Sequence, residues 1–229
     1  MVMGEHIVMN MATHRMTSRN EILTLVQLLS PSFPVGSFAY SHGLENAIHE
    51  ELIYSADDLQ DWLNYLLTQG GGCADATLLN VSFYAEEHDV QYIDASSRAF
   101  ASSKERLQET DLQGVAFCDA VNAVWGLNLT KLTYPVAVGR TARALGLCVE
   151  LTTAMFLHAF IGNMCNVAMR LVPLGQTDGQ RVQALLKPVI ISVASNMKDI
   201  TLDDLHSNTF MSDIIAMRHE TQYSRIFRT

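Results

Sequence analysis

Apolar residues recur at three- and four-residue steps along most of the chain, which is the spacing of one face of an α-helix. The strongest pattern runs from Glu150 to Val172, where apolar residues also occupy the remaining faces. A helix that is apolar nearly all round is buried inside a fold, so we expect this helix at its centre. No segment alternates apolar and polar residues between turn signals, so no β-sheet is expected.

Proline, glycine and capping residues divide the rest of the pattern into further helices. Ser55 is a good N-cap, Thr177 to Gln180 matches a capping box, and Pro188 should kink or restart its helix. The expected helices span about residues 19–29, 39–50, 56–69, 74–87, 90–106, 112–129, 134–147, 177–196 and 211–217.

These elements predict an all-α fold, a single-domain multi-helix bundle around the central buried helix at about 150–172. The chain has 229 residues and only 5 prolines, and no stretch has the composition of a linker. We expect residues 1–20 to be a flexible leader and residues 21–229 to form one helical domain. Its last part, residues 208–229, is the predicted docking segment.

The composition excludes several classes of function. The net charge of −9 argues against nucleic-acid binding, which needs clustered Lys and Arg. No apolar run reaches the ~18 residues that span a membrane. The four cysteines form no C-x-x-C pair, which favours buried thiols in a reducing cytoplasm over a disulfide set or a zinc site. With 48% hydrophobic and 17% charged residues, part of the surface is expected to be covered by other chains.

Few residues suggest chemistry of their own. His42, Glu45 and His49 would share one stripe of a helix and there form a weak candidate metal site, since nickel and zinc both accept imidazole. His158 falls on the apolar face of the central helix, where a hydrogen-bonded core histidine is more common than a catalytic base. No nucleophile and base can be assembled from the sequence, so we expect no catalytic site and no tightly bound cofactor.

Two segments suit an interface better than a core. Residues 32–45 combine aromatic residues, proline and glycine in one rigid turn, and residues 213–228 alternate basic and aromatic residues. We expect them to pack together into a partner-docking surface, with Arg225 donating to the Tyr40 hydroxyl or to nearby carbonyls. The candidate partner-binding residues are Phe33, Pro34, Gly36, Phe38, Tyr40, His42, Glu45, Arg218, His219, Tyr223, Arg225 and Phe227.

Four motifs in order give the chain a family resemblance: SFPVGSFAYSHGLE (32–45), YPVAVG (134–139), RLVPLGQTDGQ (170–180) and MRHETQYSRIFR (217–228). Together they closely resemble the UreF urease accessory proteins. The resemblance spans roughly Leu23 to the C-terminus and is weakest around residues 103–108.

The resemblance implies an all-α, non-enzymatic protein that tends to form homodimers. It also implies that the chain binds the accessory protein UreD (also called UreH), recruits the GTPase UreG and modulates it. The assembly would deliver nickel to apo-urease, and in this family the residues carried over to Tyr40 and Arg225 matter most. Two alternatives remain beside this scaffold: a stand-alone nickel-binding metallochaperone using His42, Glu45 and His49, and a helical enzyme with a pocket around His158.

Overall fold

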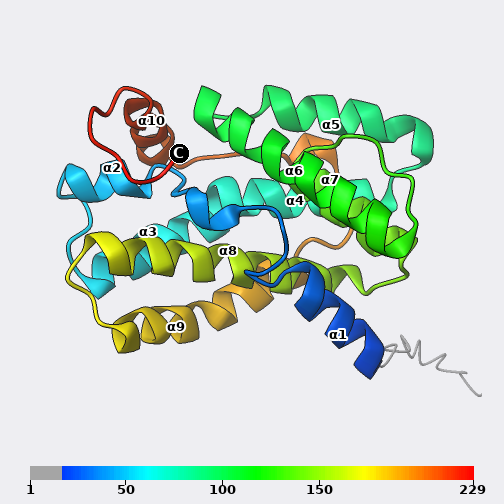
Figure 1. Ribbon diagram of the computed structural model, residues 1–229, viewed down its shortest axis with the longest axis horizontal. Helices are drawn as coiled ribbons and strands as arrows, with labels where there is room; N and C mark the ends of the chain where they lie inside the picture. The colour runs from blue at the N-terminus through cyan, green and yellow to red at the C-terminus, as the bar shows by residue number, and fades with distance from the viewer. Residues whose placement is uncertain (1–16) are drawn as a thin grey trace, which may run out of the picture.

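The computed structural model describes residues 17–229, and these residues form helices and no strand (Figure 1). Residues 1–16, most of the expected leader, lie outside the described residues. The all-α, single-domain prediction is confirmed. The helices are α1 (Arg19–Leu28), η1 (Ser37–Ala39), α2 (Leu44–His49), α3 (Ala56–Gln69), α4 (Gly71–Tyr84), η2 (Glu87–Asp89), α5 (Val90–Ala99), α6 (Lys104–Trp125), α7 (Tyr134–Ala144), α8 (Val149–Leu171), α9 (Gln176–Ser195), η3 (Leu202–Asp204) and α10 (Phe210–His219).

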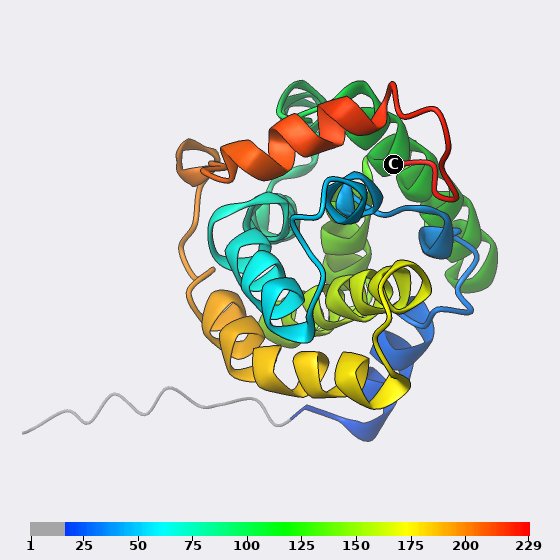
Figure 2. The same ribbon diagram turned by 90° about the vertical axis from the view of Figure 1, so that its left-hand side faces the viewer.

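Helix α8 is the central helix, as its apolar pattern predicted. It packs against α9, α4, α2, α3 and α7, and Figure 2 shows α9 lying along one of its sides. Phe156, Leu157, Ile161, Met164 and Cys165 on α8 are buried. Burial all round is nevertheless wrong, because one side of α8 lines a cavity and His158 is exposed.

Helices α4 and α7 pack closely because a glycine stands at their contact. A Cβ atom on Gly139 of α7 would lie 2.2 Å from the Leu79 carbonyl oxygen of α4. Such a distance is far below van der Waals contact, so any side chain here would push the two helices apart. The YPVAVG motif therefore places α7 directly on the backbone of α4.

Several predicted helix boundaries are wrong. The predicted helix 39–50 begins only at Leu44, because His42 and Gly43 adopt positive φ angles of 54° and 77°. The predicted helix 90–106 breaks after Ala99. Ser103 then caps α6 by accepting a hydrogen bond from the Arg106 N–H at 3.1 Å. Its short polar side chain competes with the helix ladder, so it begins a new helix here.

The other predicted helix ends agree with the structure only in part. Ser55 caps α3 and accepts from the Asp58 N–H at 3.2 Å, as predicted. Helix α4 starts inside the glycine triplet, at Gly71, three residues before the predicted start. Helix α9 continues through Pro188 to Ser195, so the helix does not restart there, and the alternative of a kink at Pro188 stays a prediction. At its start Asp178, rather than a Thr177 to Gln180 box, accepts from the Gly175 N–H at 3.2 Å.

Among residues 17–229, α8 is the one helix that is long and apolar enough to cross a membrane by length and composition. Half of that apolar stretch is buried inside the fold, as befits a core helix of a helical bundle. Three of the cysteines, Cys73, Cys118 and Cys165, are buried free thiols, and Cys148 is partly buried and also free.

Candidate functional site

The C-terminal segment, residues 217–229, folds back onto the SFPVGSFAYSHGLE motif, as predicted. Helix α10 packs on α2, and the chain then returns beside η1 and α2 (Figures 1 and 2). The Arg228 N–H donates to the Ala39 carbonyl at 2.8 Å, and the Ser41 N–H donates to the Thr229 carbonyl at 2.9 Å. The two motifs therefore form one continuous surface, although more than 170 positions separate them in sequence.

Glu45 on α2 holds this segment in place. Its carboxylate accepts from the backbone N–H groups of Ile226, at 2.6 Å, and Phe227, at 2.8 Å. Glu45 is buried, and hydrogen bonds to a buried carboxylate are stronger than those between neutral groups. Phe227 is buried beneath the segment, whereas Ile226 is exposed. Glu45 is therefore a structural anchor of the surface.

His219 links this anchor to α6. Its ring is fully buried, with Nε2 lying 3.2 Å from Glu45 and Nδ1 lying 2.7 Å from Glu105. An ionised carboxylate only accepts hydrogen bonds, so both ring nitrogens donate when both carboxylates are charged. Arg225 continues the chain by donating to Glu105 and, at 3.3 Å, to the His219 carbonyl. These four residues connect α2, α6 and the C-terminal segment.

A second buried polar cluster lies on α6, next to the first. Glu109 accepts from His42 at 2.7 Å, from Arg106 at 2.5 Å and from the Thr229 hydroxyl at 2.9 Å. Burial alone would raise the pKa of Glu109, but the charge of Arg106 and the contacts from His42 lower it to about 2. Burial and the charge of Arg106 lower the pKa of His42, which favours a neutral ring donating from Nε2.

The predicted docking residues divide into two groups. The buried group supports the surface from inside and consists of Phe33, Tyr40, Glu45, His219 and Phe227. The exposed group consists of Pro34, Phe38, Arg218, Tyr223 and Arg225, and Gly36 and His42 are partly buried. A buried side chain cannot touch a partner while the segment is docked.

The predicted contact between Arg225 and Tyr40 is wrong. Arg225 lies on Glu105 and on the His219 carbonyl, so only the predicted pairing with a nearby carbonyl is confirmed. Burial raises the pKa of the Tyr40 hydroxyl, and the nearby Arg228 opposes the rise.

The candidate metal stripe is not assembled. His42 lies outside the helix in a left-handed conformation and bonds to Glu109, while Glu45 bonds to the C-terminal segment. His49 is exposed at the far end of α2. Among residues 17–229, no group of three or more His, Cys, Asp or Glu side chains is arranged to hold a metal ion. This geometry gives no support to the metallochaperone alternative.

Sequence reasoning missed most of the supporting residues on α6. Glu105, Glu109 and Gln113 recur every four residues, and Gln113 Nε2 donates to Glu109 at 2.9 Å. All three are buried. A polar stripe of this spacing usually lies on the solvated face of a helix, so the sequence predicts exposure. The sequence did single out His42, His219 and Arg225, which contact this stripe, but it gave no sign that they pair with α6.

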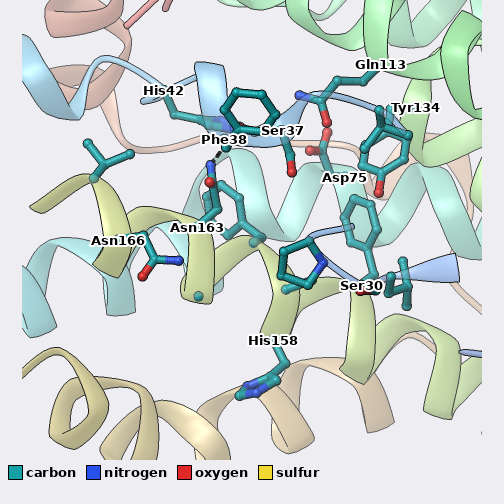
Figure 3. A pocket seen from close by; sticks show the side chains of 18 of the residues that line it. Ser30, Ser37, Phe38, His42, Asp75, Gln113, Tyr134, His158, Asn163 and Asn166 are labelled. Carbon is teal, nitrogen blue, oxygen red and sulfur yellow. Dashed lines mark hydrogen bonds between the residues drawn. The ribbon is translucent and has the colours of Figure 1, made fainter. Parts of the chain in front are cut away.

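A cavity of about 450 Å³ opens beside this network, between the 29–42 segment, α6, α8 and α9 (Figure 3). Asp75 and Gln113 contribute to its end at α4 and α6, and Figure 3 shows His158 at the opposite side, on α8. His158 is exposed, so the expectation of a core histidine is wrong. Burial and the neighbouring Lys187 lower its pKa. Within the described part of the chain, the His158 side chain makes no hydrogen bond to a residue that could act as its catalytic partner.

Comparison with known proteins identifies the family of this chain. The UreF family model matches residues 53–187. The urease accessory protein UreF of Roseobacter denitrificans is 52% identical over 212 residues, covering 93% of this chain and 96% of that protein. The UreF of Ruegeria pomeroyi is 43% identical over 213 residues, covering 93% and 98%. That of Dinoroseobacter shibae is 45% identical over 207 residues, covering 90% and 98%. The chain therefore belongs to the UreF family of urease accessory proteins.

Proposed function

We propose that this chain is a non-enzymatic scaffold in the GTP-dependent complex that matures urease by inserting nickel. The chain matches its relatives over nearly their whole length, and these relatives are named urease accessory proteins, which supports a role in urease maturation. In this proposal its partners are UreD (UreH), the GTPase UreG and apo-urease, in the cytoplasm. The chain holds no tight cofactor of its own, and nickel is cargo of the complex.

The composite surface of residues 32–45 and 217–229 carries the docking part of this proposal. It displays Phe38, Tyr223 and Ile226, which are 64%, 103% and 71% exposed. Exposed aromatic and apolar residues on a rigid mount are typical of interface anchors. The mount is rigid here because Asn163 of α8 donates to the carbonyls of Ser37, at 3.0 Å, and Tyr40, at 3.1 Å.

A pair of matched tyrosines tests the docking surface. Tyr223 lies on the C-terminal segment, and Tyr92 lies on α5; they are 103% and 70% exposed. We expect Tyr223→Ala to weaken co-purification with UreD and UreG and to lower nickel-dependent urease activation. Tyr92→Ala should leave both unchanged. Equal recovery of the partners by both variants would show that the surface lies elsewhere.

The same proposal includes a homodimer. Helix α10 packs on the fold through Ile215, Ala216 and His219, yet its outer side carries the exposed Phe210, Met211, Ile214 and Met217. This apolar face supports self-association or cover by a partner. Sedimentation of the isolated chain at micromolar concentration should show a dimer, and Ile214→Asp should shift it toward monomer. A wild-type monomer would remove the dimer from the proposal.

A further inference from the structure

The 450 Å³ cavity is large enough to hold a small molecule, since ligand sites typically have volumes of about 300–1,000 Å³. Most of its wall is apolar and comes from α1, the turn before η1 and α8: Val26, Leu29, Val35, Phe38, Met155 and Phe156. Val26 and Phe38 are exposed, so the cavity communicates with solvent at their side. An apolar ligand body would fit these walls.

The polar end of the cavity contains two carboxylates with different surroundings. Glu109 is fully engaged, because His42, Arg106, Gln113 and Thr229 all donate to it. Asp75 of α4 is not: its closest cationic contact is Arg106 Nη2 at 3.7 Å, beyond hydrogen-bonding distance. Its side chain is 20% exposed, and it lines the cavity. Asp75 is therefore a mostly buried acceptor that faces open space.

The charge balance at this end favours a cation. Asp75 and Glu109 carry two negative charges, Arg106 carries one positive charge, and His42 is neutral. One negative charge is left over on a mostly buried side chain, where an uncompensated charge is costly. A metal ion fits poorly, since no set of three or more ligating side chains occurs among residues 17–229.

We propose that the cavity binds a small organic ammonium ion carried on an apolar chain or ring. The ammonium group donates to Asp75 at the α4–α6 end. The apolar body packs between Phe38, Met155 and Phe156. This site adjoins the docking surface, because Phe38 belongs to both, but its binding of an ammonium ion does not depend on the role in urease maturation.

The probe for this site is n-hexylamine, measured by titration calorimetry on the full chain at pH 7.5. Its control ligand is 1-hexanol, which has the same chain length and no charge. We expect hexylamine to bind at least about tenfold more tightly than hexanol, because only the amine pairs with Asp75. Equal affinity, or no binding of hexylamine at millimolar concentration, would overturn the proposal.

Three variants locate the binding. Asp75→Asn should weaken hexylamine at least about tenfold while leaving hexanol unchanged. Ala159→Leu, which narrows the cavity at α8, should weaken both ligands. Asp61→Asn removes an exposed carboxylate of α3 and should change neither. Melting curves check that each variant is folded. Hexylamine affinity that is unchanged in folded Asp75→Asn would contradict the assignment.

A pH series on the wild-type chain tests the site without a substitution. Hexylamine remains charged from pH 5 to 7.5, whereas burial raises the pKa of Asp75 to about 6. The charges of Arg106 and Glu109 act on Asp75, and Asp75 acts on Tyr134 of α7. Asp213 of α10 acts on Arg106. The other titratable groups that line the cavity are His42, His158 and Arg170. Protonation of Asp75 or His42 adds positive charge, so affinity should fall at least about threefold at pH 5. An affinity that is flat or higher at pH 5 would refute the role of Asp75.

Discussion

The Glu45 carboxylate accepts a hydrogen bond from the Phe227 N–H at 2.8 Å across 182 positions of sequence. The same carboxylate also accepts a hydrogen bond from the Ile226 N–H and contacts Nε2 of the buried His219 ring. One side chain of a six-residue helix thus determines where the C-terminal segment lies. These contacts, together with those of Arg228 and Thr229, hold the segment on the 32–45 motif.

Glu45→Ala should release residues 220–229 without unfolding the core. Each lost hydrogen bond to a buried charge costs about 1.5–3 kcal/mol, and the cost falls on the local contacts of the segment. Trypsin should then cleave faster after Arg225 and Arg228, at an almost unchanged global melting temperature. Glu50→Ala, at the exposed end of α2, is the control and should keep the wild-type cleavage rate.

Arg225→Ala should weaken assembly with the GTPase roughly ten- to a hundred-fold, because a charged hydrogen bond on Glu105 is lost. Helicity and the thermal midpoint should stay nearly unchanged. Tyr40→Phe should give a smaller loss. Since Arg225 donates to Glu105 and the His219 carbonyl and not to Tyr40, the two effects should add in the double variant. Pull-downs paired with melting curves measure this, and strong non-additivity would show that the two residues are coupled.

Asp75→Asn should change how stability depends on pH. Burial raises the pKa of Asp75 from 3.8 to about 6, so between these values the folded chain binds the proton more tightly than the unfolded chain. This group therefore stabilises the fold below pH 3.8, and its contribution is lost as pH rises through 6. The variant should gain about 1–3 kcal/mol in unfolding free energy relative to wild type between pH 4 and 7.

Urea denaturation of Asp75→Asn and wild type at both pH values measures this gain. Asp61→Asn, which removes an exposed carboxylate, should show no such change with pH. A constant difference between Asp75→Asn and wild type would mean that Asp75 is not held in a water-poor site.

Ile161→Ala should lower the free energy of unfolding by about 2–5 kcal/mol, because Ile161 is fully buried on α8. Ile191→Ala on α9 removes the same atoms from a residue that is 60% exposed, and should cost below about 0.5 kcal/mol. Chemical denaturation of both variants compares them directly. Similar losses would mean that α8 is not the core helix.

The central helix was predictable because residues 150–172 are apolar on most faces, and such a helix is stable only when it is buried in the core of a helical protein. The Ser55 cap was predictable for the same local reason. His42 was not, since its left-handed backbone is held by contacts with α6 and the C-terminal segment. The buried stripe of Glu105 and Glu109 was missed because burial of charge depends on distant partners, His219 and His42.

The order of biosynthesis gives the C-terminal segment one further property. A ribosome makes the 39–45 turn and α6 long before residues 219–229, which complete the surface through Glu45 and Glu105. Until then, both carboxylates lack their histidine and arginine partners. A nascent chain with a formed helical core but without residues 219–229 would thus lack the finished surface, and under the proposed function its partners would bind it only after these residues have emerged.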